Sequence, residues 1–260
     1  MENLVLYCKS FSRDINLVYR LVESINKFNE DNITTYISIP KQDLEMFKSL
    51  NLENIILIED ELVYEGNAPG WQQQQIVKSS FYKLGFAKNW VCLDSDAYFI
   101  KPFYINDFMY DNETPYTVMH EQKELFTWTA LNSHKLGFDP KQSFTDDRKQ
   151  IMSIFGRKGK VYDFGPVPTI WSSKVWEDLE SKYMIPNNLT FQQLINHCPS
   201  EFTWYGEALL YFNSIKIYPA EPIFKVFHYK QQLEEFQQLN LSVDVISKNY
   251  LGIIIQSNFN

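Results

Sequence analysis

Short, continuous apolar runs alternate with amphipathic stretches along the first hundred residues. The runs Leu4–Cys8, Ile33–Ile39 and Ile55–Ile58 are typical of strands buried on both faces. Between the first two, residues 14–28 carry apolar side chains at helical spacing behind Asp14, which can cap a helix. Residues 42–50 predict a shorter helix before the third strand. This order predicts a mainly parallel sheet with right-handed crossovers.

A second helix-to-strand unit follows the break at Pro69-Gly70. Residues 71–86 predict a helix, and the apolar run Trp90–Leu93 predicts a fourth strand. In open sheets of this class, ligands bind at the carboxyl ends of the strands. Ser10, Asp60 and the segment Asp94–Asp96 all follow predicted strands. One cleft can therefore collect them.

The alternation weakens beyond Pro102. The patterns there predict short strands at 116–119 and 167–170, helices at 146–155 and 173–182, a helix after Pro199-Ser200, and a late strand region at 218–228. The last 30 residues read as an appended tail with no assigned elements. We find no repeat and no linker, so the pattern predicts a single domain.

Composition narrows the class of protein. Apolar residues make up 45% of the 260 residues, which is enough for a full core. The net charge of −8 argues against a general nucleic-acid binder. Three widely spaced cysteines indicate reduced thiols. No segment is apolar enough to cross a bilayer, and the N-terminus lacks a secretory signal pattern. We expect a cytoplasmic protein, with peripheral contact at the inner face of the membrane left open.

The triplet Asp94-Ser95-Asp96 is the strongest chemical signal. Two carboxylates one residue apart, where a buried strand ends, can hold a hard cation such as Mn²⁺ or Mg²⁺. Such an ion keeps coordination positions for water or substrate phosphates. The alternative is a solvated turn. His228, after another apolar run, offers an imidazole that can complete the metal ligands, although a histidine flanked by aromatic residues also suits packing.

Further polar residues are candidates for donor binding and acid–base chemistry. Gln75 and Lys78 lie near one another on the predicted helix 71–86, where they either contact the ligand or form a solvated surface. Glu201 follows the N-cap Ser200, so it either stabilises the helix start or acts as a general base. Glu207 is the second candidate base. The basic residues Arg148 and Arg157 belong to a stretch that is either solvated or contacts phosphate.

With these residues in place, the chain resembles GT-A-type nucleotide-sugar glycosyltransferases, and most of all a poorly characterised bacterial and viral branch linked to surface-polysaccharide synthesis. The resemblance spans about residues 1–230. It is carried by Asp94-Ser95-Asp96, by Gly165-Pro166, by Gly70-Trp71 with Gln74, Gln75 and Lys78, and by Ser200-Glu201-Phe202 with Tyr205-Gly206.

The resemblance implies a Rossmann-like nucleotide-binding half (1–102) and an acceptor-side half (103–230), and the C-terminal tail (231–260) has no counterpart in it. It implies that Asp94 and Asp96, with His228, hold Mn²⁺ or Mg²⁺ on the donor diphosphate. Ser10 and Asp60 would face the nucleoside, and Ser95 would let the donor approach closely. The expected activity is transfer from a nucleotide diphosphate sugar, most of all a UDP-sugar, to a glycan or lipid-linked glycan in polysaccharide or lipopolysaccharide synthesis.

Two alternatives remain at this stage. A metal-dependent phosphohydrolase can use a D-x-D motif, but those enzymes place it on their first strand. A non-catalytic module that binds glycans or nucleotides would use the same aromatic and acidic residues without turnover. A dinucleotide dehydrogenase is disfavoured, because Cys8-Lys9-Ser10-Phe11 follows the first strand where a glycine-rich G-x-G-x-x-G motif belongs.

Overall fold

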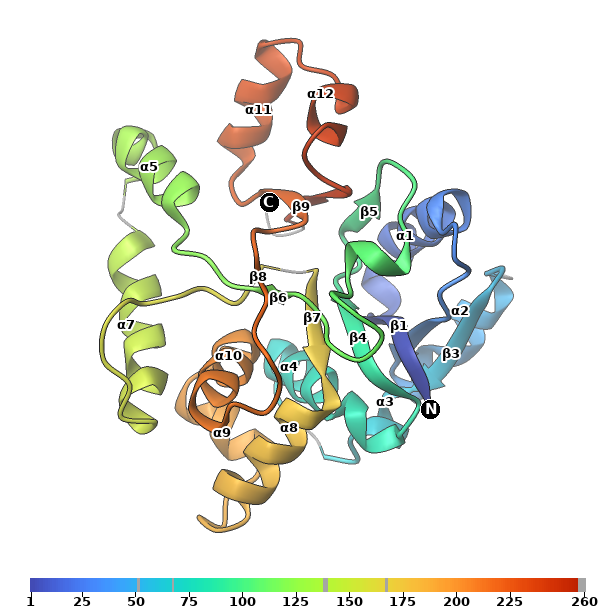
Figure 1. The fold of residues 1–260 in the computed structure, drawn as a ribbon. Coiled ribbons are helices and arrows are strands. Elements are labelled where there is room, and N and C mark those ends of the chain that lie inside the picture. The colour runs from blue at the N-terminus through green and yellow to red at the C-terminus, as the bar shows by residue number, and fades with distance from the viewer. Residues whose placement is uncertain (51, 67, 138–139, 167, 257–260) are drawn as a thin grey trace.

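A five-stranded sheet forms the centre of the protein in this computed structural model, which describes residues 1–50, 52–66, 68–137, 140–166 and 168–256 (Figure 1). Four strands are parallel: β1 (Glu2–Lys9), β2 (Thr35–Ile39), β3 (Ile55–Glu59) and β4 (Ala87–Leu93). The strand β7 (Thr169–Ser172) pairs antiparallel with β4 and completes the order β3-β2-β1-β4-β7. The predicted mainly parallel sheet is therefore confirmed. Val167, which was expected to begin the last of these strands, lies outside the described residues.

The helices between the parallel strands follow the sequence pattern. The helix α1 (Ile15–Phe28) buries Val18, Leu21, Val22 and Ile25, four of its predicted apolar positions. It is followed by α2 (Leu44–Ser49), α3 (Asp60–Val63) and α4 (Gly70–Ser80). The helix expected over 71–86 ends early, because a 3₁₀ turn at Phe81–Leu84 and the left-handed Gly85 (φ 65°) redirect the chain into β4. Other 3₁₀ turns lie at Ser12–Asp14, Lys41–Asp43 and Ile105–Asp107.

Aromatic packing fixes the helices that follow β7 against the sheet. Trp90 on β4 lies opposite Trp171 on β7, with ring centroids 6.0 Å apart. Trp171 in turn contacts Trp176, and all three rings are fully buried. Trp176 belongs to α8 (Ser173–Leu179), which continues as a π-helical turn at Glu180–Met184 and leads to α9 (Phe191–His197) and α10 (Glu201–Phe212). Because α10 packs on α8, the tryptophan cluster positions the helix that begins with Glu201.

A second, three-stranded sheet joins the chain beyond the D-x-D triplet to the C-terminal region. The strand β10 (Gly252–Ile255) lies between β5 (Ala97–Phe99) and β9 (Phe224–Phe227). A Cβ atom on Gly252 would come within 2.2 Å of the Phe224 ring, so only glycine fits there. The residues expected to form a tail also include α11 (Lys230–Gln238) and α12 (Val243–Ser247).

The remaining elements belong to residues 103–230, the half that the sequence led us to expect on the acceptor side. The late strand region is split, with β8 (Pro219–Ala220) pairing with β6 (Thr117–Val118) and β9 joining the second sheet. The helices α5 (Lys123–Leu131), α6 (Ser133–Leu136) and α7 (Pro140–Ile154) follow β6, and Figure 1 shows α5 and α7 on one side of the molecule. In the part of the chain that the structure describes, no helix has the length and apolar character needed to cross a membrane.

Candidate active site

The D-x-D triplet lies in the turn that joins the two sheets. Asp94 follows β4, and its carbonyl oxygen accepts a hydrogen bond from the amide of Ala97 at 3.1 Å. The Ser95 hydroxyl donates to the Asp14 carboxylate at 2.7 Å, which ties the turn to the start of α1. Burial raises the pKa of the Cys8 thiol, and the charges of Asp94 and Asp96 add to that rise. Both carboxylates therefore lie near the carboxyl end of β1, which is the neighbour of β4 in the sheet.

Lys78 carries a buried positive charge in this site. Its side chain is buried, and its ammonium group forms an ion pair with the Asp94 carboxylate. Its Nζ also lies 3.9 Å from the Glu201 carboxylate. Burial is the largest single effect and opposes the charged form, but Asp94, Cys92 and Glu201 together outweigh it and raise the pKa of Lys78 above its ordinary value. The site therefore carries a fixed positive charge between two carboxylates, and the structure brings Lys78 and Asp94 together.

Glu201 reaches the same place from α10. Ser200 caps this helix, with its hydroxyl accepting from the Thr203 amide at 3.4 Å, so Glu201 is the first helical residue. A carboxylate at this position also benefits from the helix dipole. Burial raises the pKa of Glu201 to about 7, and Lys78 offsets part of that rise. Near neutral pH the carboxylate can thus gain or lose a proton, which is the property a general base requires.

These residues line a pocket of about 340 Å³, which we call the Lys78 pocket. Gln74 donates to Asp94 at 3.4 Å. Gln75, the residue expected to bind the donor, also lines the pocket, and its Oε1 is buried without a hydrogen-bond partner among the described residues. The full lining is Trp71, Gln74, Gln75, Lys78, Asp94, Asp147, Arg148, Pro199, Ser200, Glu201 and Phe202.

Ser10 and Asp60 form a separate polar group at the carboxyl end of the sheet. Lys9 Nζ joins them, bonding to the Ser10 carbonyl oxygen at 2.6 Å and to Asp60 Oδ2 at 2.8 Å. Burial raises the pKa of Asp60, and Lys9 offsets part of that rise. The Ser10 hydroxyl is buried without a hydrogen-bond partner among the described residues. Neither residue lines the Lys78 pocket, so this group is a second, adjacent candidate for donor contacts.

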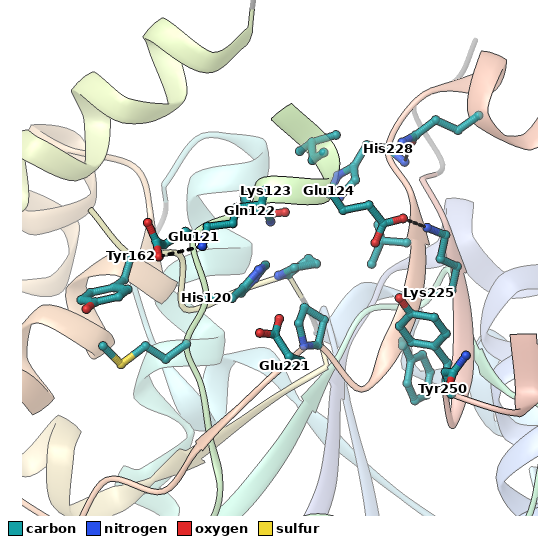
Figure 2. A pocket seen from close by; sticks show the side chains of 18 residues that line it. His120, Glu121, Gln122, Lys123, Glu124, Tyr162, Glu221, Lys225, His228 and Tyr250 are labelled. Carbon is teal, nitrogen blue, oxygen red and sulfur yellow. Dashed lines mark hydrogen bonds and ion pairs between the residues drawn. The ribbon is translucent and has the colours of Figure 1, made fainter. Parts of the chain in front are cut away.

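His228 lies outside the Lys78 pocket and lines a different one (Figure 2). Burial lowers its pKa to about 4, although the Asp163 carboxylate opposes this shift, so the imidazole is neutral. In the second sheet, Ile254 pairs with Ala97 on one side and with Val226 on the other. Asp96 directly precedes β5 and His228 directly follows β9. Both residues therefore lie at the same end of the second sheet.

The chemistry of Asp94 and Asp96 fits a hard divalent cation. Both offer carboxylate oxygens from one turn, which are ligands that Mn²⁺ and Mg²⁺ accept. Within the described residues, no three histidine, cysteine or acidic side chains lie close enough together to hold a metal ion. A cation at the triplet would thus take its remaining ligands from water or from substrate phosphates.

Glu207, the second candidate base, points away from the Lys78 pocket. It is fully buried on α10 and forms a two-pronged ion pair with Arg157, through Nε and Nη2. Arg157 follows α7, so this pair joins α7 to α10. The structure gives Glu207 a contact that stabilises the fold and no contact with the pocket.

We expect Arg157→Met to destabilise the protein by about 3 to 5 kcal/mol, because it leaves the Glu207 carboxylate buried without its partner. The double variant Arg157→Met/Glu207→Gln removes the uncompensated charge and should recover most of the loss. Urea denaturation monitored by tryptophan fluorescence measures both. Equal loss in the single and double variants would contradict this role.

Sequence reasoning missed a network centred on Asp163. Arg148 lines the Lys78 pocket and donates from Nη2 to Asp163 Oδ1 at 2.7 Å, while Gln122 donates to Asp163 Oδ2. From the sequence, Arg148 was expected either to be solvated or to contact a phosphate, as part of a basic stretch. No local pattern marks Asp163, because its partners come from distant segments.

The glycine motifs have a packing role beside this network. A Cβ atom on Gly165 would lie 3.3 Å from the Phe202 ring, and one on Gly206 would lie 2.0 Å from the Phe164 ring. Only a residue without a side chain at position 206 lets the 163–166 segment pack against α10. These glycines therefore bring the segment that carries Asp163 close to Glu201's helix.

Comparisons with known proteins agree with this architecture. Residues 6–251 match the model of DUF6492, described as a family of unknown function, and no curated protein matches the sequence significantly. Mouse xyloside xylosyltransferase 1, in its apo form, is similar with a TM-score of 0.52 and 8% identity over 99% of both chains. The apo WbbM bifunctional glycosyltransferase is similar with a TM-score of 0.54 and 11% identity over 97% of this chain and 45% of its own. The protein thus has the GT-A-like fold of glycosyltransferases and spans less than half of the WbbM chain.

Proposed function

This chain belongs to the DUF6492 family and folds like glycosyltransferases, and we propose that it transfers a sugar from a nucleotide diphosphate sugar, a UDP-sugar above all, to a hydroxyl of a glycan or lipid-linked glycan. One observation carries the proposal: a buried lysine lies between Asp94 and Glu201 in a pocket at the carboxyl end of β4. Polysaccharide or lipopolysaccharide synthesis is the process that such an activity would serve.

The residues of the Lys78 pocket suit the charges of this reaction. The acceptor oxygen forms a bond to the anomeric carbon, and the bond from that carbon to the diphosphate breaks, leaving its electron pair on the diphosphate. Lys78 and Arg148 place positive charge in the pocket, where it stabilises the departing diphosphate. A Mn²⁺ or Mg²⁺ ion held by Asp94 and Asp96 would supply further Lewis-acid stabilisation of that charge.

Glu201 serves the acceptor side of the reaction. If the anomeric centre inverts, its carboxylate takes the proton of the attacking hydroxyl, and its pKa of about 7 suits that task. If the centre is retained, the same carboxylate positions the acceptor or stabilises the cationic sugar. Gln74 and Gln75 provide amide groups for the hydroxyls of the donor sugar. Ser10 and Asp60 provide a hydroxyl and a carboxylate for the nucleoside.

Nucleotide binding tests the proposal directly. We expect uridine diphosphate with Mn²⁺ to raise the melting temperature by about 5 to 10 °C at a ligand concentration of roughly one hundred times Kd. Guanosine, cytidine and thymidine diphosphates, each with and without Mn²⁺, are the comparison. Asp94→Asn should lose the Mn²⁺-dependent part of the shift, whereas the exposed Asp244→Asn should keep it. No shift with any of the four nucleotides would sink the proposal.

The two alternative functions give different results in the same protein. A phosphohydrolase would release inorganic phosphate from simple phosphate esters. A binding module would retain the nucleotide-sugar unchanged. Hydrolysis or transfer that consumes a UDP-sugar and yields uridine diphosphate distinguishes the proposed function from both.

A further inference from the structure

A second pocket of about 450 Å³ opens on the acceptor-side half of the protein (Figure 2). Its walls come from segments that are far apart in the sequence: residues 119–125 beside α5, Tyr162 and Pro166, residues 221–228 around β9, and Asn249 with Tyr250 before β10. None of the residues to which the proposed function gives a role lines it, whereas His228, a metal-ligand candidate from the sequence, does. We call it the acceptor-side pocket.

The charged residues on this wall neutralise one another. Lys225 forms an ion pair with Glu124, and Glu121 pairs with Lys123 at 3.3 Å and with Lys160 at 2.8 Å. Figure 2 shows the Lys225–Glu124 contact at the edge of the cavity. The wall therefore offers no surplus of positive charge for a phosphate or diphosphate group.

The rest of the lining suits an uncharged, hydroxyl-rich ligand. Gln122 and Asn249 carry amides, and the exposed Glu221 carries a carboxylate that accepts hydrogen bonds from hydroxyls. Tyr250 and Phe224 add aromatic surface beside these groups. A sugar ring presents hydroxyls at its edge and C–H groups on its face, so it matches this combination of polar and apolar walls.

A buried carboxylate connects this pocket to the Lys78 pocket. Asp163 accepts from Gln122, which lines the acceptor-side pocket, and from Arg148, which lines the Lys78 pocket. Although burial opposes ionisation, the Arg148 guanidinium holds the pKa of Asp163 below its ordinary value. One ionised side chain thus fixes a residue in each of the two pockets.

The backbone at Gly165-Pro166 forms part of the same wall. Pro166 lines the acceptor-side pocket, and His120 bonds through Nε2 to the Gly165 carbonyl oxygen at 2.6 Å. On its other side, Gly165 packs against Phe202, which lines the Lys78 pocket. Residues 163–166 therefore contact lining residues of both pockets.

We infer that the acceptor-side pocket binds an uncharged sugar unit of the acceptor, and that this unit, rather than a phosphate of a lipid carrier, is what the protein recognises there. The inference rests on the proposed function, since it assigns the second substrate of that reaction. A sugar held in this pocket lies beside residues 163–166, which also pack against α10, the helix that carries Glu201.

Saturation-transfer NMR with methyl glycosides of glucose, galactose, xylose and N-acetylglucosamine tests the inference. We expect at least one of them to bind the wild-type protein. Glu221→Gln and Tyr250→Ala should each weaken that binding about tenfold, because each removes a contact with the ring or its hydroxyls. The matched controls Glu23→Gln and Tyr19→Ala, on the exposed side of α1, should leave it unchanged. No binding of any glycoside, or equal binding in all variants, would overturn the inference.

Nucleotide binding to the same variants separates this inference from the proposed function. Glu221→Gln should keep the full melting shift with uridine diphosphate and Mn²⁺, since the variant leaves the Lys78 pocket intact. Loss of that shift would overturn the inference, because the pocket would then belong to the donor. Glycoside binding in a protein that binds no nucleotide would support the sugar site and contradict the proposed function.

Discussion

Asp96→Ala is expected to lower sugar transfer about a thousandfold, equivalent to ~4 kcal/mol of transition-state stabilisation. The variant lacks one of the two carboxylates proposed to hold the cation on the leaving diphosphate. The other, Asp94, already forms an ion pair with Lys78. Initial rates of uridine diphosphate release from UDP-sugars, at saturating Mn²⁺, measure the change.

Two comparisons make that result specific. Asp96 is buried, so a change of side-chain volume could itself disturb the fold. Asp96→Asn keeps nearly the same volume, and it should lose transfer to a similar degree. The exposed Asp244→Ala should transfer like the wild type, and all three proteins should melt cooperatively. Wild-type rates in a folded Asp96→Ala protein, with the metal chelated, would remove the metal from the mechanism.

Glu201→Gln is expected to lower turnover by about 10² to 10⁴ while nucleotide binding persists, because the amide cannot take a proton from the acceptor. The wild-type rate should rise with pH and level off, with a midpoint near the Glu201 pKa of about 7. The residual rate of the variant should lose this dependence. Unchanged turnover in Glu201→Gln would dismiss the base while leaving the metal-binding residues in place.

The stability of the wild type should respond to pH in the opposite way to its activity. The pKa of Glu201 is raised from 4.5 in the unfolded chain to about 7 in the folded one, so the folded state holds the proton more tightly. The stability that this provides is full below about pH 4.5 and declines as the pH rises through 7, by about 3 kcal/mol in all. The free energy of unfolding of the wild type should therefore fall between pH 5 and pH 8, relative to that of Glu201→Gln. Urea midpoints at the two pH values measure it.

Glu207→Gln separates catalysis from packing on the same helix. It weakens the ion pair with Arg157, so it should lower the urea midpoint and leave the pH profile of turnover with the same midpoint as the wild type. A shifted pH midpoint in this variant would return Glu207 to the list of candidate bases.

The fold of the first hundred residues follows from local sequence patterns. Continuous apolar runs and helical spacing predicted β1 to β4 and α1, because strands buried on both faces and amphipathic helices leave direct signals. The second sheet was predicted only in part, because the strand region expected at 218–228 contains β9 but no pattern marked β10. Its central strand β10 is only four residues long, and it pairs with β5 and β9, about 155 and 28 residues away, so its existence depends on distant partners.

The sequence by itself placed Ser10, Asp60 and Asp94 at one edge of the sheet, since parallel strands all end there. It marked Lys78 and Glu201 as candidates from their positions on predicted helices, and the structure brings these two together with Asp94. Tertiary structure alone decided the rest. Glu207 pairs with Arg157, His228 lines the acceptor-side pocket, and Asp163 joins the two pockets. Those outcomes depend on how α7, α10 and the 163–166 segment pack against one another. The type and spacing of side chains along the chain do not show which distant residue a charged side chain meets once its helix is packed.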